Sequence, residues 1–175
     1  MRKILLLTPI VASAALVLLA AGPAFAQPPA ETDTTFELIG GSLGISAPVG
    51  PVSLGTGAAS VGGQPITGSL GAVTVTDNRG NTLGWTASAQ STDFEAGDLT
   101  VPATVVSYAS TDATPTGTVT VTPAAAADLS AASPVETATG VAGAHSATWN
   151  PNLSIAVPAG TQTGLYTATL THSVL

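Results

Sequence analysis

The sequence predicts an all-β fold, an antiparallel β-sandwich that is immunoglobulin-like in general architecture. Apolar and polar residues alternate with period two in several short runs, as they do in strands with one face in a core. Glycine, proline and asparagine separate these runs at intervals of about ten residues, which is typical of sandwiches. Helical periodicity is not sustained anywhere in the chain. Together these observations favour packed antiparallel sheets over parallel βαβ units.

The N-terminal segment, residues 1–26, has the pattern of a signal peptide. After a basic start, Ile4 to Leu19 form an apolar run, and Ala24-Phe25-Ala26 matches a cleavage site. Retention as a membrane anchor is the alternative, because the run approaches the length that spans a bilayer. Pro9 inside the run and the small residues at the cleavage site favour removal. The sequence therefore predicts a secreted protein of the cell surface or cell wall.

Residues 27–35 predict a flexible leader, because two prolines and short polar side chains offer nothing to bury. Residues 36–175 then make up the sandwich domain. The 175-residue chain without its first 26 residues has 149, enough for one domain that buries roughly two thirds of its unfolded surface. The chain has no cysteine, which excludes disulfide-stapled folds and thiol chemistry.

The balance of charge excludes two classes of partner. Once Arg2 and Lys3 leave with the signal peptide, one basic residue, Arg79, stands against ten acidic ones, a formal charge of −9. Nucleic acids and anionic lipid surfaces are bound by clustered lysine and arginine. We therefore expect no nucleic acid partner, and no membrane contact after signal cleavage.

Strands are predicted where the alternation is clearest, within residues 70–76, 118–122, 153–157 and 165–175. Ala124 to Ala132, which follows a proline, is the one candidate for a helix, and a turn without helix is the equal alternative. Sequences between the strands are rich in glycine, asparagine and aspartate, as turns require.

The C-terminal run is the most regular of these strands. One face carries Tyr166, Ala168, Leu170, His172 and Val174, and the other carries threonine and serine. This pattern predicts a strand with one apolar face turned to the core and one hydroxyl-lined face turned outward.

A polar turn follows the strand Val73–Thr76, and a second strand follows the turn. Trp85 and two alternating alanines share one face of this second strand, which predicts a β-hairpin with Asp77 and Arg79 at its tip. In a structural interpretation, Asp77 caps the turn and pairs with Arg79 while Trp85 fills the core. In a functional interpretation, an exposed Trp85 stacks on a ligand and Asp77, Asn78 and Arg79 form its polar rim.

Two stretches of the chain resemble the WxL domain of Gram-positive cell-surface proteins. The first contains Val75-Thr76-Asp77-x-Arg79-Gly80, then Gly84-Trp85 and a downstream Phe94, and the second is the final strand, Gly164 to Leu175. The chain departs from both Trp-x-Leu motifs of the family. It has Trp85-Thr86-Ala87 at the first motif and His172-Ser173-Val174 at the second. It therefore resembles a divergent member.

The resemblance implies a secreted β-sandwich that attaches noncovalently to the cell wall through peptidoglycan or another wall glycan. Sugars bind by stacking on exposed aromatic rings and by hydrogen bonds to planar polar groups. The residues that this interpretation assigns to ligand binding are Asp77, Asn78, Arg79, Trp85, Trp149 and Tyr166. Burial is the alternative for both tryptophans, with Trp149 as a lid over one end of the sandwich.

The residues that support catalysis are sparse. His145 lies in a loop-like stretch and His172 on the inner face of the last strand, and neither has a second metal ligand at short spacing. No Gly-x-Ser-x-Gly elbow occurs. Asp93, Glu95 and Asp98 are the nearest approach to a carboxylate cluster, and they predict a solvated turn or, alternatively, a weak calcium site.

We therefore expect a noncatalytic domain without cofactor or metal that binds the cell wall. The chain shows no sorting motif and no lipid-anchored cysteine, so attachment is expected through the folded face. Two alternatives remain. One is a structural sandwich that assembles with other exported surface proteins through an exposed strand edge. The other is a secreted enzyme with an unrecognised site.

Overall fold

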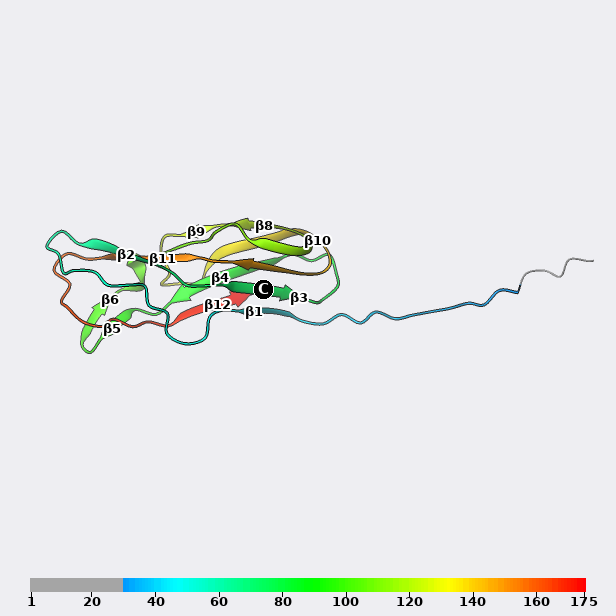
Figure 1. The fold of residues 1–175 in the computed structure, drawn as a ribbon, viewed down its shortest axis with the longest axis horizontal. Helices are drawn as coiled ribbons and strands as arrows, with labels where there is room; N and C mark the ends of the chain where they lie inside the picture. The colour runs from blue at the N-terminus through cyan, green and yellow to red at the C-terminus, as the bar shows by residue number, and fades with distance from the viewer. Residues whose placement is uncertain (1–29) are drawn as a thin grey trace, which may run out of the picture. The chain divides into compact units, whose positions relative to one another are not determined.

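The computed structural model describes residues 30–175 (Figure 1). The predicted signal peptide and the first leader residues lie outside the described residues. Residues 30–36 are exposed and form neither helix nor strand, and Glu37–Leu175 form one compact unit. Within residues 30–175, no helix is long and apolar enough to cross a membrane.

The prediction of an all-β sandwich is confirmed, because antiparallel strands make up nearly all the regular structure of this unit. The larger sheet contains β1 (Leu43–Ser46), β3 (Val73–Asp77), β4 (Trp85–Ser91), β8 (Thr114–Pro123), β10 (Ser133–Trp149) and β12 (Leu170–Val174). The smaller sheet contains β2 (Gln64–Ser69), β7 (Val106–Ala109), β9 (Ala125–Ala126) and β11 (Asn152–Val157). A hairpin of β5 (Phe94–Ala96) and β6 (Leu99–Val101) and one 3₁₀ turn, η1 (Ala103–Val105), complete the described elements.

The predicted hairpin between β3 and β4 is wrong. Both strands pair with β10 instead of with each other: Asp77 lies opposite His145, and Trp85 lies opposite Ala138. Because β8 follows the other edge of β10 along its length, β3 and β4 lie end to end on one side of β10. The 78–84 loop between them therefore does not reverse the chain, because β3 and β4 run in the same direction along β10.

The outer neighbours of β3 and β4 repeat this arrangement. β1 pairs with β3 and β12 pairs with β4, so β12 and β1 also lie end to end. The backbone of Leu175 exchanges two hydrogen bonds with Thr86, and Gly41 N–H donates to the Asn78 carbonyl. The larger sheet is therefore four strands wide, with β10 as its only long internal strand.

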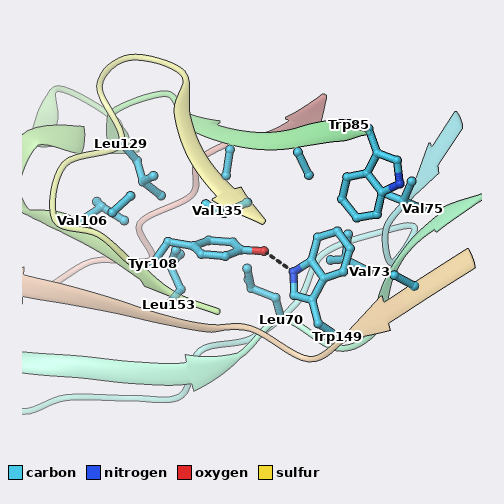
Figure 2. Packing of buried hydrophobic residues seen from close by; sticks show 14 of the residues in the cluster. Leu70, Val73, Val75, Trp85, Val106, Tyr108, Leu129, Val135, Trp149 and Leu153 are labelled. Carbon is cyan, nitrogen blue, oxygen red and sulfur yellow. Dashed lines mark hydrogen bonds between the residues drawn. The ribbon is translucent and has the colours of Figure 1, made fainter. Parts of the chain in front are cut away.

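The core lies between the two sheets (Figure 2). Trp85, Trp149 and the valines of β3 come from the larger sheet, and Tyr108 and Leu153 come from the smaller one. On β4 and β10 the tryptophans are followed or preceded on the inner face by buried alanines, which leave room for large side chains of the opposite sheet.

Strand β10 was not predicted, and its sequence explains why. Gly140 and Gly143 adopt positive φ angles where the pairing register shifts, so the strand contains bulges that break the alternation. His145, predicted in a loop, lies on this strand and is 5 % exposed. Alternation of His145, Ala147 and Trp149 was the signal that could have revealed it.

Two further predictions differ from the structure in detail. Ala124–Ala132 does not form a helix: it contains β9 and a turn in which Asp128 accepts a hydrogen bond from Ser130 N–H and Leu129 is fully buried. The final strand begins at Leu170, since the residues before it are joined to the 92–95 segment by an isolated bridge between Thr167 and Glu95 and by hydrogen bonds between Thr169 and Thr92. Its predicted alternation of inner and outer residues is confirmed.

Candidate functional site

Asp77 and Arg79 form a two-point ion pair at the start of the 78–84 loop. Asp77 Oδ1 accepts hydrogen bonds from Arg79 N–H at 2.9 Å and from Nε at 3.0 Å, and Oδ2 accepts one from Nη2 at 2.7 Å. Arg79 Nη2 also donates to the Gly84 carbonyl at 3.1 Å, which ties both ends of the loop together. These hydrogen bonds from Arg79 hold the pKa of Asp77 below its usual value although the carboxylate is buried.

Trp85 and His145 form the buried half of the same network. Trp85 Nε1 donates to His145 Nε2 at 2.9 Å, and His145 Nδ1 lies 3.1 Å from the Gly143 carbonyl. This geometry requires the neutral tautomer with the proton on Nδ1, because Nε2 must accept. Asp77 Oδ2 lies 3.8 Å from His145 Nε2. The four side chains therefore lock β3, β4 and β10 together around the loop.

The functional interpretation of the aromatic residues is corrected by their burial. Trp85 is 3 % exposed and Trp149 is 1 % exposed, so neither indole can stack on a ligand. Asp77 is also buried, and its carboxylate is occupied by Arg79. The structural interpretation of the turn and of Trp85 is the one that fits.

The remaining predicted ligand residues do not form one surface. Asn78 is exposed beside the Asp77–Arg79 pair, whereas half-buried Tyr166 lies in the segment before β12 and donates its hydroxyl proton to the Gln162 carbonyl. Trp149 is part of the core rather than a lid over one end. The six residues are therefore distributed over two internal networks and separate loops.

A second buried chain of hydrogen bonds crosses between the sheets. Trp149 Nε1 donates to the Tyr108 hydroxyl at 3.0 Å (Figure 2), and that hydroxyl lies 3.2 Å from His172 Nε2. Since the Tyr108 oxygen accepts from the indole, its proton is free to be donated to His172. Burial raises the pKa of Tyr108 and lowers the pKa of His172, so both groups are neutral at physiological pH.

The lowered pKa of His172 predicts that the folded protein loses stability in mild acid. Its pKa is lower in the folded state than the unfolded value of about 6.5, so protons favour the unfolded chain. The stabilising contribution is complete above pH 6.5 and is lost as the pH falls from 6.5 toward the folded pKa. We expect urea unfolding at a series of pH values to show this slope in the natural protein and a smaller slope in His172→Gln. Equal slopes in the two proteins would contradict the assignment.

Glu136 is a buried carboxyl group that the sequence did not single out. It lies on the inner face of β10, fully buried, where Oε1 accepts a hydrogen bond from the Ser110 hydroxyl and Oε2 has no partner. Burial raises its pKa. Because no solvent reaches the group, it contributes to the core rather than to a site open to substrate.

The acidic residues around Gly97 do not converge. Asp93 Oδ1 accepts a hydrogen bond from Ala103 N–H at 2.8 Å, whereas Glu95 and Asp98 are exposed on the β5–β6 hairpin. Among residues 30–175, no three histidine or acidic side chains come together in a group that could hold a metal ion.

The outer face of the larger sheet carries hydroxyl groups in rows. Strand register aligns Thr114, Thr148, Thr74 and Ser46 in one row, Thr116, Ser146 and Thr76 in the next, Thr122, Thr137 and Thr86 in a third, and Ser88 with Ser173 in a fourth. All of these side chains are exposed or half-buried. We call this surface, defined by these residues, the hydroxyl face.

The hydroxyl face has no charge. The ionisable side chains of its six strands, Asp77, Glu136, His145 and His172, all lie on the inner side of the sheet. Within the face, Thr74 Oγ1 and Thr148 Oγ1 hydrogen-bond across neighbouring strands at 2.9 Å. Comparison of the chain with protein-family models, with curated proteins and with solved structures gave no match.

Proposed function

We propose that this protein is an exported, noncatalytic domain that binds uncharged cell-wall polysaccharide through the hydroxyl face. The observation that carries the proposal is the alignment of Ser and Thr side chains in uncharged rows across four strands. The signal-peptide pattern and the resemblance to WxL domains support the wall as the place of action. The hydroxyl face takes the role that the sequence had assigned to the tryptophans.

The chemistry of the face suits a glycan. Each hydroxyl both donates and accepts hydrogen bonds, as sugar hydroxyl and acetamido groups do, and bridging water can extend its reach. Within a strand, residues two apart are separated by about 6.6 Å, and neighbouring strands lie about 4.8 Å apart. Threonine is β-branched and stiff at χ1, so holding it in place on binding costs little conformational entropy. The face therefore offers a fixed grid of hydrogen-bonding groups to an extended polymer.

A noncatalytic role is supported by the internal contacts of five ionisable side chains. Asp77, Arg79 and His145 hydrogen-bond to one another or to the backbone, His172 pairs with Tyr108, and Glu136 is closed off from solvent. General acid–base work requires such groups to be within reach of a substrate. None of these five groups is arranged in that way around an open site.

Removal of two hydroxyl groups from one row tests the proposal. The double variant Thr76→Val with Thr116→Val keeps β-branched residues in exposed strand positions that both lie beside Ser146. A hydrogen bond contributes about 0.5–1.5 kcal/mol, so we expect retention on purified, protein-free peptidoglycan to weaken about tenfold. Cosedimentation at low and high salt measures it, and retention is expected to be insensitive to salt because the face is uncharged.

The matched control is Thr100→Val with Thr104→Val, which removes two exposed hydroxyls outside the hydroxyl face. This control is expected to bind like the natural protein, and circular dichroism checks that both double variants fold. Unchanged retention in the Thr76/Thr116 variant would contradict the proposal.

A second candidate function is assembly with another exported protein, and the free edge of β8 favours it. Among residues 30–175, this ten-residue strand pairs only with β10, so its other edge offers backbone groups that can accept an added strand. The same cosedimentation separates the two candidates. Binding to protein-free glycan supports the first, and binding only when other wall proteins are present supports the second.

A further inference from the structure

A cleft of about 750 Å³ lies between the β1–β2 connection and the segment that leads into β12. Its walls are mainly aliphatic, and Leu54, Ile66, Val101, Ile155 and Leu170 are among its lining residues. This volume falls within the range of about 300–1,000 Å³ that is typical of small-molecule sites. The cleft opens between the sheets and is distinct from the hydroxyl face on the outside.

The lining of the cleft disfavours a charge on the part of the ligand that enters it. None of its residues is aspartate, glutamate, lysine, arginine or histidine, although the chain contains ten acidic residues. A buried charge on the ligand would find no opposite charge and would lose its hydration, which is strongly unfavourable.

Three polar side chains at the cleft are hydrogen-bonded within the protein. Gln64 Nε2 donates to the Ala58 carbonyl, the Tyr166 hydroxyl donates to Gln162, and the Ser91 hydroxyl donates to Thr92. Among the described residues, the one buried side-chain atom without a hydrogen bond is Glu136 Oε2, and Glu136 does not line the cleft. No fully buried polar side-chain atom of the lining is therefore left without a hydrogen bond.

The segment Pro48–Ala59, which we call the strap, covers one side of the cleft. Among the described residues, no backbone hydrogen bond joins the strap to another element. The strap packs closely against Gly68 on β2, where an added Cβ atom would lie 2.7 Å from Leu54 Cα. Displacement of the strap would therefore break no backbone hydrogen bond to a sheet, but it would break the bond from Gln64 Nε2 to the Ala58 carbonyl and the packing of Leu54.

We propose that this cleft binds a single uncharged hydrocarbon chain, such as the acyl chain of a neutral lipid, between the strap and the inner walls. The aliphatic lining and the absence of charged side chains match a ligand that offers apolar surface. The polar end of the ligand remains at the mouth of the cleft. This site is independent of glycan binding by the hydroxyl face.

A chain-length series tests the site directly. Monoacylglycerols with octanoyl, decanoyl and dodecanoyl chains are titrated below the concentration at which they form micelles, and methyl NMR shifts are followed. Ile66 and Ile155 line the cleft and are expected to shift, whereas Val73 in the core is the internal reference. Each added methylene group is expected to tighten binding about fourfold, until the cleft is full. Affinity independent of chain length would overturn the proposal.

Variants of Ala168 and Gly68 test the location. Ala168→Trp places a large ring on a half-buried lining position and is expected to weaken binding at least tenfold, with Ala168→Leu as the smaller change should the first fail to fold. Ala109→Trp, at an exposed position outside the cleft, is the matched control.

Gly68→Ala pushes the strap away from β2 and is expected to increase the rate at which the ligand enters the cleft. Natural affinity in both Ala168 variants would overturn the proposal.

Discussion

Trp149→Ala is expected to lower the free energy of unfolding by about 3–5 kcal/mol, which is close to the whole stability of a marginal domain. The indole is 1 % exposed and lies in the centre of the core, between the two sheets (Figure 2). Its removal leaves a large cavity and also takes away the hydrogen bond that fixes the Tyr108 hydroxyl. Urea unfolding monitored by circular dichroism measures the change.

Trp149→Phe separates the two contributions. The phenyl ring keeps most of the packing but has no N–H, so Tyr108 loses one donor while its own proton still reaches His172. We expect this variant to lose clearly less stability than the alanine variant. A loss below about 1 kcal/mol for Trp149→Ala would show that the ring does not hold the sheets together.

Trp85→Ala is expected to destabilise the protein by a similar amount, about 3–5 kcal/mol, for a partly different reason. Besides the cavity, it leaves His145 Nε2 buried without a donor, next to the Asp77 carboxylate. An unsatisfied buried acceptor costs about 1–3 kcal/mol. The variant therefore weakens the junction of β3, β4 and β10 as well as the core, and thermal and urea unfolding measure the combined effect.

Trp85→Phe distinguishes a core residue from a ligand platform. It retains an aromatic ring but removes the donor to His145, so we expect lower stability and unchanged retention on peptidoglycan below the unfolding temperature. If Trp85→Phe lost retention on peptidoglycan while its stability stayed unchanged, this expectation would be contradicted and the indole would be assigned to ligand binding.

The sequence predicted the fold class and the strands with clean alternation, because a half-buried strand imposes period two on its own residues. β11 and β12 are of this kind. The β3–β4 hairpin was wrong because alternation identifies strands but not their partners. A short polar segment between two strands predicts reversal, and here the chain passes straight on along β10, with Arg79 closing the loop between the strands.

The contacts of the candidate site depend on pairings that are distant in the sequence. Trp85 and His145 are 60 positions apart, and their contact follows from the register of β10 against β3 and β4. The hydroxyl face depends on the same register, because the threonines of β8 form rows with those of β3 and β4 only when β10 aligns them. The alternation within one strand predicts that a hydroxyl group points outward, but it does not predict which residues of other strands lie beside that group.

The arrangement around β10 also determines the order in which the chain can fold. β4 has two neighbours in the sheet, β10 and β12, and both are synthesised after it. β8 pairs with β10, which is also synthesised after it. Much of the larger sheet therefore has no partner until residues 133–149 have left the ribosome, and pairings across such sequence distances form slowly. A chain of this design is therefore expected to complete its larger sheet after synthesis rather than during it.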